Sequence, residues 1–300
     1  MGKLIRGLIK GHRVRFLACD SKDIIQEICN LRQPTPVVCA ALGRLVSVGA
    51  MMGKMEKEED TVVSLRIQGN GPLKMMIVDA TGSGKVRGYV ANPYVDIPLK
   101  ENGHLDVGGA VGKGILSVTK SLGLKQDFEG QVELQSGEIG DDFSYYFVVS
   151  EQTPSVVAVG VLVDVDYSIK YSGGLIVQML PDASEEDYVF IEECSKNIKS
   201  VTKLLEKHNG NLHDIVCDIF GDTEYEESFY IEYECSCSVE KFIDLIATLP
   251  IENIEEMINE DHGAEVRCNF CGKTHNLSEE DLKQSLEKAI ENKKKKENQE

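Results

Sequence analysis

The sequence predicts an α+β protein: a large N-terminal domain around a mostly antiparallel sheet with helices, then a helical linker region and a small four-cysteine domain. In residues 1–178, short β-like runs outnumber helical runs and do not alternate with them. That order is typical of an antiparallel sheet and not of a doubly wound parallel one. Residues 179–234 have a largely helical, acidic pattern, and residues 235–290 hold two close pairs of cysteines.

Composition limits the classes of function. A chain of 300 residues is long enough for about two domains, and 42% hydrophobic with 27% charged residues is the balance of a folded protein. Lys and Arg number 32 against 50 Asp and Glu, so the net charge is −18. Because an acidic body repels nucleic acid phosphates and anionic lipids, we expect no nucleic acid partner and no membrane partner.

Neither a membrane span nor an export signal is expected. The most apolar stretch, Val37–Met52, carries Arg44 and is shorter than the ~20 residues that a span needs. The first seven residues, MGKLIRG, contain no apolar signal core. We therefore expect a cytoplasmic protein, and in that compartment cysteines serve metal binding or redox chemistry more often than stable disulfides.

The first elements follow from local patterns. Two strands, Leu4–Ile9 and Val14–Cys19, precede a helix near residues 22–31. A second helix begins at Thr35, which can act as the N-cap, and Pro36 suits the first helical position. Small residues along one side of this helix predict the close approach of another element.

A series of β-like runs follows, separated by Gly, Asn and Pro turns. The predicted strands are Val62–Ile67, Met75–Val78, Val86–Val90, Ile115–Thr119, Gln131–Leu134, Tyr145–Ser150, Val156–Val165 and Leu175–Leu180. They complete the predicted N-terminal core domain, residues 1–178.

The linker, residues 179–234, is predicted to be metastable. From Ser184 the pattern is helical, and one apolar stripe recurs at steps of three and four residues: Ile191, Cys194, Ile198, Val201 and Leu205. A second short helix fits Leu212–Phe220. The segment holds 15 Asp and Glu against 4 Lys and Arg, a net charge of −11. A short, charged segment of this kind is only marginally stable by itself.

The last block is predicted to be a small domain followed by a tail. Ser238 can cap a helix that runs to Leu249, a second helix fits Ile251–Asn259, and Glu265–Arg267 is predicted to be a strand. Ser278 begins the last helix. Residues 291–300 are rich in lysine and are predicted to form a solvated, frayed tail.

The cysteine spacing is the most informative motif. Cys235 and Cys237 are followed, after thirty intervening residues, by Cys268 and Cys271, with Gly272 directly behind them. Four thiolates in two close pairs match a tetrahedral four-cysteine site for one zinc ion per chain. Structural zinc contributes about 10–16 kcal/mol of apparent binding free energy to a small domain. Because oxidants attack thiolates, the motif is either a plain structural staple or an oxidant-triggered unfolding switch.

The histidines and the scattered cysteines indicate less about function than the two cysteine pairs. His262 and His275 lie near the cysteine pairs and are alternative metal ligands. Cys39 and Cys194 fall on apolar helical faces and are predicted to be small core residues. No catalytic constellation is found, and the chain is not expected to be an enzyme.

Taken in order, several segments resemble the redox-regulated heat shock protein 33 family, also called the 33 kDa chaperonin. The most specific are Cys235–Ser238 and Cys268–Cys271 at this spacing. Other similar segments are Gly71–Leu73, Val86–Val90, Asn92–Pro93, Val111–Thr119, Ser150–Ser155, and Gly173–Gly174 with Gln178 and Pro181. The sequence departs from the family at His275, where an aromatic residue such as Tyr is expected, and in its unusually charged linker and tail.

The resemblance implies a cytoplasmic, ATP-independent holdase of the oxidative stress response. Reduced Cys235, Cys237, Cys268 and Cys271 would hold zinc and keep the chaperone inactive. Peroxide with unfolding stress, or hypochlorous acid, would form the disulfides Cys235–Cys237 and Cys268–Cys271, zinc would leave, and the C-terminal region would unfold. The protein would then dimerise and bind unfolding clients, preventing their aggregation.

Two other functions remain as alternatives. The first is a zinc-ribbon adaptor for nucleic acid or transcription, which the lysine tail favours and the net charge opposes. The second is a thiol oxidoreductase that uses Cys268 and Cys271, although these do not begin a helix after an early strand, as such enzymes require.

Overall fold

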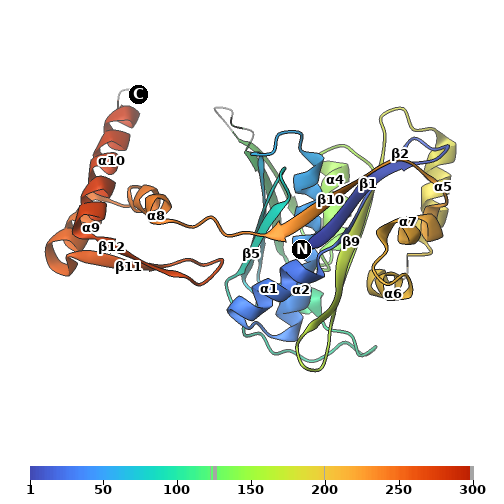
Figure 1. The fold of residues 1–300 in the computed structure, drawn as a ribbon, viewed down its shortest axis with the longest axis horizontal. Coiled ribbons are helices and arrows are strands. Elements are labelled where there is room, and N and C mark those ends of the chain that lie inside the picture. Colours follow the sequence, from blue (N-terminus) through green and yellow to red (C-terminus); the bar gives the residue numbers. More distant parts are fainter. Residues whose placement is uncertain (122, 124–126, 199, 298–300) are drawn as a thin grey trace. The chain divides into compact units, whose positions relative to one another are not determined.

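The computed structural model describes residues 1–300 except 122, 124–126, 199 and 298–300 (Figure 1). The chain divides into two compact units, Met1–Glu234 and Cys235–Glu300. Each unit has its own apolar core.

The first unit contains a ten-stranded sheet with helices. The strands are β1 (Gly2–Ile9), β2 (Val14–Asp20), β3 (Val62–Gly69), β4 (Met75–Thr81), β5 (Lys85–Val90), β6 (Gly114–Ser121), β7 (Phe128–Glu133), β8 (Ser155–Val163), β9 (Ile169–Met179) and β10 (Thr223–Tyr233). The helices are α1 (Lys22–Arg32), α2 (Pro36–Met55), α3 (Val107–Val111), α4 (Gly140–Val149), α5 (Glu185–Ser195), α6 (Val201–Lys207) and α7 (Leu212–Phe220).

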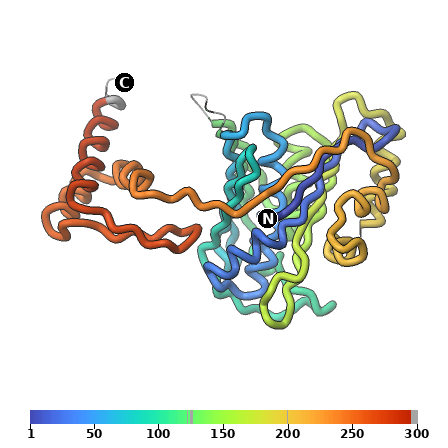
Figure 2. Tube along the Cα trace, in the orientation of Figure 1, coloured from blue at the N-terminus to red at the C-terminus, as the bar shows by residue number. Residues whose placement is uncertain are grey.

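The sheet confirms the predicted mostly antiparallel architecture. Its strand order is β7-β6-β3-β4-β5-β10-β1-β2-β9-β8. Within the described residues, β10 and β5 are the parallel neighbours, and every other neighbouring pair is antiparallel. The trace in Figure 2 shows β10, in orange, running beside β1, in dark blue.

Helix α2 forms the centre of the core, packed on the sheet. A Cβ added at Gly43 would lie 2.8 Å from Val161 Cγ2, and one added at Gly53 would lie 2.8 Å from the carbonyl oxygen of Thr81, so the predicted close approach is confirmed. By length and composition α2 could cross a membrane, but 89% of its most apolar 18-residue window is buried inside the protein. Burial of this kind is what the core helix of a folded domain shows.

One prediction about local structure is correct in position but not in its hydrogen bond, and another is wrong. Thr35 is the N-cap residue of α2, but its hydroxyl donates to the carbonyl of Val95 at 2.6 Å and caps nothing. The predicted strand Tyr145–Ser150 is instead the end of α4, with Ser150 as its C-cap residue. Phe143, Tyr146 and Phe147 are fully buried at helical spacing, and this period outweighs the β-like composition of the run.

The linker segment combines helices with a strand that the sequence did not predict. The single helix expected from Ser184 to Leu205 is divided into α5 and α6, while α7 occupies its predicted position. Residues 223–233 are not helical but form β10, which lies between β5 and β1 in the sheet.

The start of α5 is fastened to the turn between β1 and β2. His12 Nδ1 lies 2.9 Å from Asp187 Oδ1, and the His12 ring stacks on Phe190 with 3.7 Å between ring centroids. Asp187 also accepts from the backbone and hydroxyl of Ser184, which completes a capping box. The Ser184 amide, with His12 and other donors, lowers the pKa of Asp187 to about 2. The buried carboxylate therefore stabilises the position of α5 in its charged form.

The second unit is a small helical domain with a two-stranded sheet. It contains α8 (Val239–Ile246), α9 (Ile251–Glu256), a π-helical turn (Met257–Asp261), β11 (Gly263–Arg267), β12 (Thr274–Ser278) and α10 (Glu279–Glu297). Ser238 caps α8 by accepting from the amide of Lys241, although the helix ends earlier than predicted. The expectation of a frayed tail is wrong for residues 291–297, because α10 continues through them.

We predict that Asp187→Asn weakens the attachment of α5. A carboxyl group with a lowered folded-state pKa stabilises the fold above its unfolded pKa of about 3.9, and this contribution is lost as the pH falls towards 2. Loss of the charged acceptor is expected to cost about 1–2 kcal/mol of local opening free energy at pH 7. Hydrogen exchange of the amides of residues 185–195 measures this opening free energy.

Asp182→Asn is the matched control for this prediction. Asp182 pairs with Arg13 beside the same turn, but both side chains are more than half exposed. Exposed ion pairs contribute about 0–1 kcal/mol, so little change in exchange is expected. Equal exchange in Asp187→Asn and the unmodified protein would show that this contact does not hold α5.

Candidate metal centre

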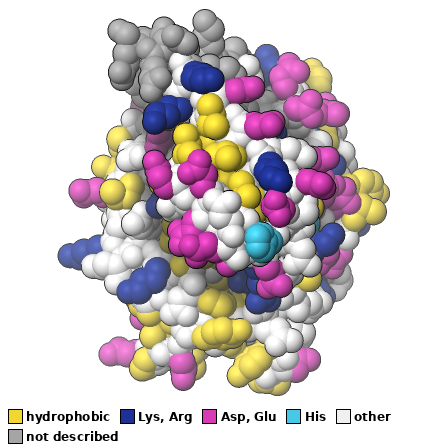
Figure 3. Space-filling view, turned by 90° about the vertical axis from the view of Figure 1, so that its left-hand side faces the viewer, with side chains coloured by type: hydrophobic (Ala, Val, Ile, Leu, Met, Phe, Trp, Pro, Cys, Tyr) yellow, Lys and Arg dark blue, Asp and Glu magenta, His cyan; other side chains and the backbone are white. Residues whose placement is uncertain are grey.

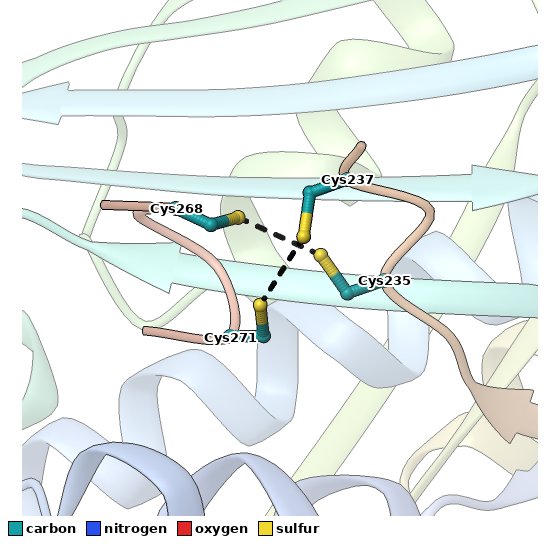
Figure 4. Close-up of side chains that lie close together, drawn as sticks. All are labelled: Cys235, Cys237, Cys268 and Cys271. Carbon is teal, nitrogen blue, oxygen red and sulfur yellow. Dashed lines mark hydrogen bonds between the residues drawn. The ribbon is translucent and has the colours of Figure 1, made fainter. Parts of the chain in front are cut away.

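The four sulfurs of Cys235, Cys237, Cys268 and Cys271 form one cluster, within 4.8 Å of one another (Figure 4). Cys235 Sγ lies 3.6 Å from Cys268 Sγ, and Cys237 Sγ lies 3.5 Å from Cys271 Sγ. A tetrahedral zinc ion with bonds of ~2.3 Å places its sulfur ligands about 3.8 Å apart, whereas a disulfide needs about 2.05 Å. The cluster therefore fits a tetrahedral metal ion and a reduced state.

A tight turn after β11 positions the second pair. The carbonyl of Cys268 accepts from the amide of Gly272 at 2.8 Å, and Gly272 has φ of 75°, a conformation that glycine adopts without strain. The amides of Cys271 and Phe270 donate to the Cys268 sulfur. Burial opposes ionisation of Cys268, but these donors and the neighbouring thiols lower its pKa. The turn thus favours the thiolate form of one of the four sulfurs.

Cys235 and Cys237, the first pair, lie in the segment before α8. Their environment raises their pKa values, in contrast to that of Cys268. Burial raises the pKa of Cys235, and burial with hydrogen bonds to the thiols of Cys271 and Cys235 raises the pKa of Cys237 to about 12. Four thiolates packed this closely repel one another unless a cation lies among them, since a bound cation reverses this effect. The donor set is therefore suited to a soft divalent cation such as zinc.

His275 lies beside the cluster and His262 does not. His275 Nε2 is 3.3 Å from Cys237 Sγ, and its buried ring packs against Phe242 with centroids 5.1 Å apart. Among the described residues the metal-binding group comprises the four cysteines without His275, so this ring contacts a ligand rather than completing the set. His262 lies 3.6 Å from Glu279 and is largely exposed.

The remaining cysteines include a close pair that the sequence did not indicate. Cys29 and Cys39 are buried in α1 and α2 with their sulfurs 2.8 Å apart. The hydrogen bond to Cys39, followed by burial, raises the pKa of Cys29, and burial raises that of Cys19 to about 12. The signal available in the sequence was the ten-residue spacing across two helices, which alone does not specify a contact. Cys194 is half-buried, as a helical core position allows.

The predicted linker stripe packs on the sheet of the first unit. Ile191 and Leu205 are buried, and Cys194, Ile198 and Val201 are partly buried against the same cluster. The apolar partners come from β1, β2 and β9 and include Phe16, Ala18, Leu175 and Val177. The space left between α6, α7 and the sheet is about 10 Å³, near the lower limit for a single water molecule.

Comparison with known proteins identifies the family. The family model described as Hsp33 protein matches residues 2–278. The 33 kDa chaperonin of Caldanaerobacter subterraneus subsp. tengcongensis is 44% identical over 92% of this chain and 95% of its own. The 33 kDa chaperonin of Geobacillus kaustophilus is 40% identical over 94% of this chain and 96% of its own.

A solved structure agrees with these relatives. The crystal structure of a 33 kDa chaperonin from Thermotoga maritima, described as a heat shock protein 33 homologue, matches with a TM-score of 0.85 and 36% identity. The match covers 96% of this chain and 99% of that one. These names describe a chaperone, which is not an enzyme. The chain belongs to the Hsp33 family of chaperones.

Proposed function

We propose that this protein is a redox-regulated, ATP-independent holdase, inactive when its four clustered cysteines are reduced and hold zinc. The observation that carries the proposal is the spacing of the four sulfurs, which suits one metal ion. We place the protein in the cytoplasm, where thiols are kept reduced until an oxidant appears.

Cys235, Cys237, Cys268 and Cys271 would hold the ion. When bound, zinc supplies a four-way cross-link between the segment before α8 and the turn after β11. The unit around it has a small apolar core drawn from α8, α9, β12 and α10. A domain of this size depends on such a cross-link for its stability.

Oxidation removes the ligands. A cysteine thiolate attacks hydrogen peroxide, becomes a sulfenic acid and releases hydroxide; a second thiolate then attacks that sulfur, forming a disulfide and a second hydroxide. Formation of each disulfide transfers two electrons from the two sulfurs to one molecule of hydrogen peroxide. We propose Cys235–Cys237 and Cys268–Cys271 as the products. These two disulfides together consume all four thiolates, so no thiolate ligand is left for the ion.

The linker is the element that responds. Residues 179–234 carry a net charge of −11 and are held on the first unit by the apolar contact of α5–α7 with the sheet. When the second unit unfolds, the chain directly after β10 is no longer anchored, and a charge-dense segment gains entropy by detaching. Its departure uncovers apolar side chains of β1, β2 and β9, which bind clients through the hydrophobic effect without nucleotide. The same surface would support the oxidised homodimer.

The charge distribution supports client proteins over nucleic acid as partners. On the face drawn in Figure 3, acidic side chains lie among the basic ones and break up any continuous basic surface. A nucleic acid interface needs a basic patch that follows the phosphate backbone.

Replacing all four cluster cysteines by serine is predicted to switch the chaperone on without oxidant. Serine hydroxyls do not replace thiolates as zinc ligands, so the variant is expected to contain no zinc and to have an unfolded second unit. It should suppress client aggregation when fully reduced. Metal analysis, circular dichroism and light scattering of a heat-unfolded client are measured on the same sample.

Cys217→Ser is the matched control. Cys217 is partly exposed and lies outside the cluster, so this variant should keep its zinc and stay inactive until oxidised. A freshly purified, thiol-protected protein without metal, or a quadruple variant that behaves like the unmodified protein, would refute the proposal.

Disulfide mapping after peroxide treatment is predicted to find Cys235–Cys237 and Cys268–Cys271. Cys19 and Cys29 should remain reduced, because burial and thiol contacts raise their pKa values and thiolates are the reactive form. Peptide mass spectrometry after alkylation of free thiols gives the map. Cross-motif disulfides, Cys235–Cys268 and Cys237–Cys271, would also consume the four ligands but would keep the two segments cross-linked, and would contradict the proposed pairing.

A further inference from the structure

Strand β10 gives the linker a second role, because it is both the end of the linker and a central strand of the sheet. It lies between β5 and β1, and Glu234 then leads directly to Cys235, the first cluster ligand. In Figure 1 the orange strand is flanked by both halves of the sheet. If the linker detaches as proposed above, β10 leaves and the sheet acquires new edges.

The attachment of β10 to its two neighbours is uneven. Against β1 it pairs antiparallel from Gly2↔Ile231 to Ile9↔Thr223, with an irregularity between Arg6 and Leu8. Against β5 the register contains the pairs Glu232↔Lys85 and Tyr233↔Val86. These pairs stand at the end of β10 that precedes Cys235, so loss of the cluster frees the weaker side first.

Backbone pairing holds β10 more than side-chain burial does. Within the strand, Ile231 is fully buried, while Tyr225 and Tyr230 are 81% and 70% exposed. The neighbour β1 is different, since its Leu4, Ile5 and Ile9 are buried. The sheet therefore keeps its core when β10 departs, and β1 becomes an edge with a row of free amides and carbonyls.

The vacated position has a defined chemistry. Phe229, Ile231 and Tyr233 occupy alternate, inward-facing positions, so the end of the site nearest Cys235 accepts an apolar residue at every second place. Basic groups border it: Arg6 pairs with Glu227 at 2.6 Å, Lys85 pairs with Glu234 at 2.7 Å, and Lys54 lies over the Phe229 ring. On a chain of net charge −18 these cations favour acidic residues before and after the apolar positions.

We propose that the edge of β1 vacated by β10 is a binding site for an extended segment of an unfolding client, which adds antiparallel to β1 in the register of β10. The inference rests on the proposed function. Segments with alternating apolar residues are buried strands in native proteins and are exposed when these unfold. Backbone hydrogen bonds give affinity for many sequences, and the alternate pockets select strand-forming ones.

The probe is a labelled peptide with the sequence of residues 223–233, added to the full-length protein. It is expected to bind the oxidised protein and to compete with an unfolding client, while the reduced, zinc-loaded protein binds it at least about ten-fold more weakly. A scrambled peptide of the same composition controls for charge and hydrophobicity.

N-methylation of the probe peptide distinguishes strand addition from non-specific hydrophobic binding. The amides of Glu232 and Glu234 donate towards β5, so by alternation those of Phe229 and Ile231 face β1. N-methylation at Phe229 and Ile231 should weaken binding about ten-fold or more, whereas N-methylation at Ser228 and Tyr230 should not. Equal effects of the two methylated peptides would overturn the proposal.

A second variant tests the site without oxidant. Ile231→Ala removes the buried anchor of β10 and is expected to raise peptide binding by the reduced protein about ten-fold, with zinc retained. Tyr225→Ala, at an exposed position of the same strand, should change nothing. An oxidised protein that suppresses client aggregation but ignores the peptide would overturn this inference alone, while one that suppresses nothing would overturn the proposed function as well.

Discussion

The close packing of four sulfurs is the constraint on which the rest of the structure depends. Four thiolates within 4.8 Å of one another would repel strongly, so a cation among them would stabilise the turn that brings them together. In the proposed mechanism the second unit depends on ligands that are also oxidisable groups. Stability and redox sensitivity would then reside in the same atoms, and any chemistry that removes these ligands would also remove the support of the fold.

In the proposed mechanism, the chain connection turns this local event into a change in the first unit. The two parts of the sequence are joined directly: β10 ends at Tyr233, and the first cysteine of the cluster is Cys235. The linker before it covers an apolar face with helices α5–α7, and its last strand completes the sheet. A single continuous segment therefore covers both surfaces that we propose for client binding, the apolar face and the strand edge.

Sequence reasoning could predict much of this because the relevant signals are local. The cysteine spacing, the start of α2 at Pro36 and the apolar stripe from Ile191 to Leu205 each depend on neighbouring residues. The mostly antiparallel sheet followed from the density of β-like runs. In contrast, the β-branched and aromatic residues of Tyr145–Ser150 favour a strand by composition, whereas burial of Phe143, Tyr146 and Phe147 selects a helix.

Other features could not be predicted, because they depend on partners distant in sequence. Strand β10 is rich in glutamate and mostly exposed, and it is a strand only because β1 and β5 supply backbone partners. The contacts of His12 with Asp187 and of Cys29 with Cys39 likewise join elements whose meeting no spacing rule specifies. Such contacts follow from topology, and topology is set by the whole core.

Hydrogen exchange across residues 185–233, compared between the reduced, zinc-loaded protein and the same sample after peroxide treatment, tests the central claim most directly. The account predicts strong protection of α5–α7 and of β10 in the reduced protein, and its loss together with the metal after oxidation. If an oxidised, metal-free and client-binding protein kept full protection in this segment, release of the linker could not be the cause of activation.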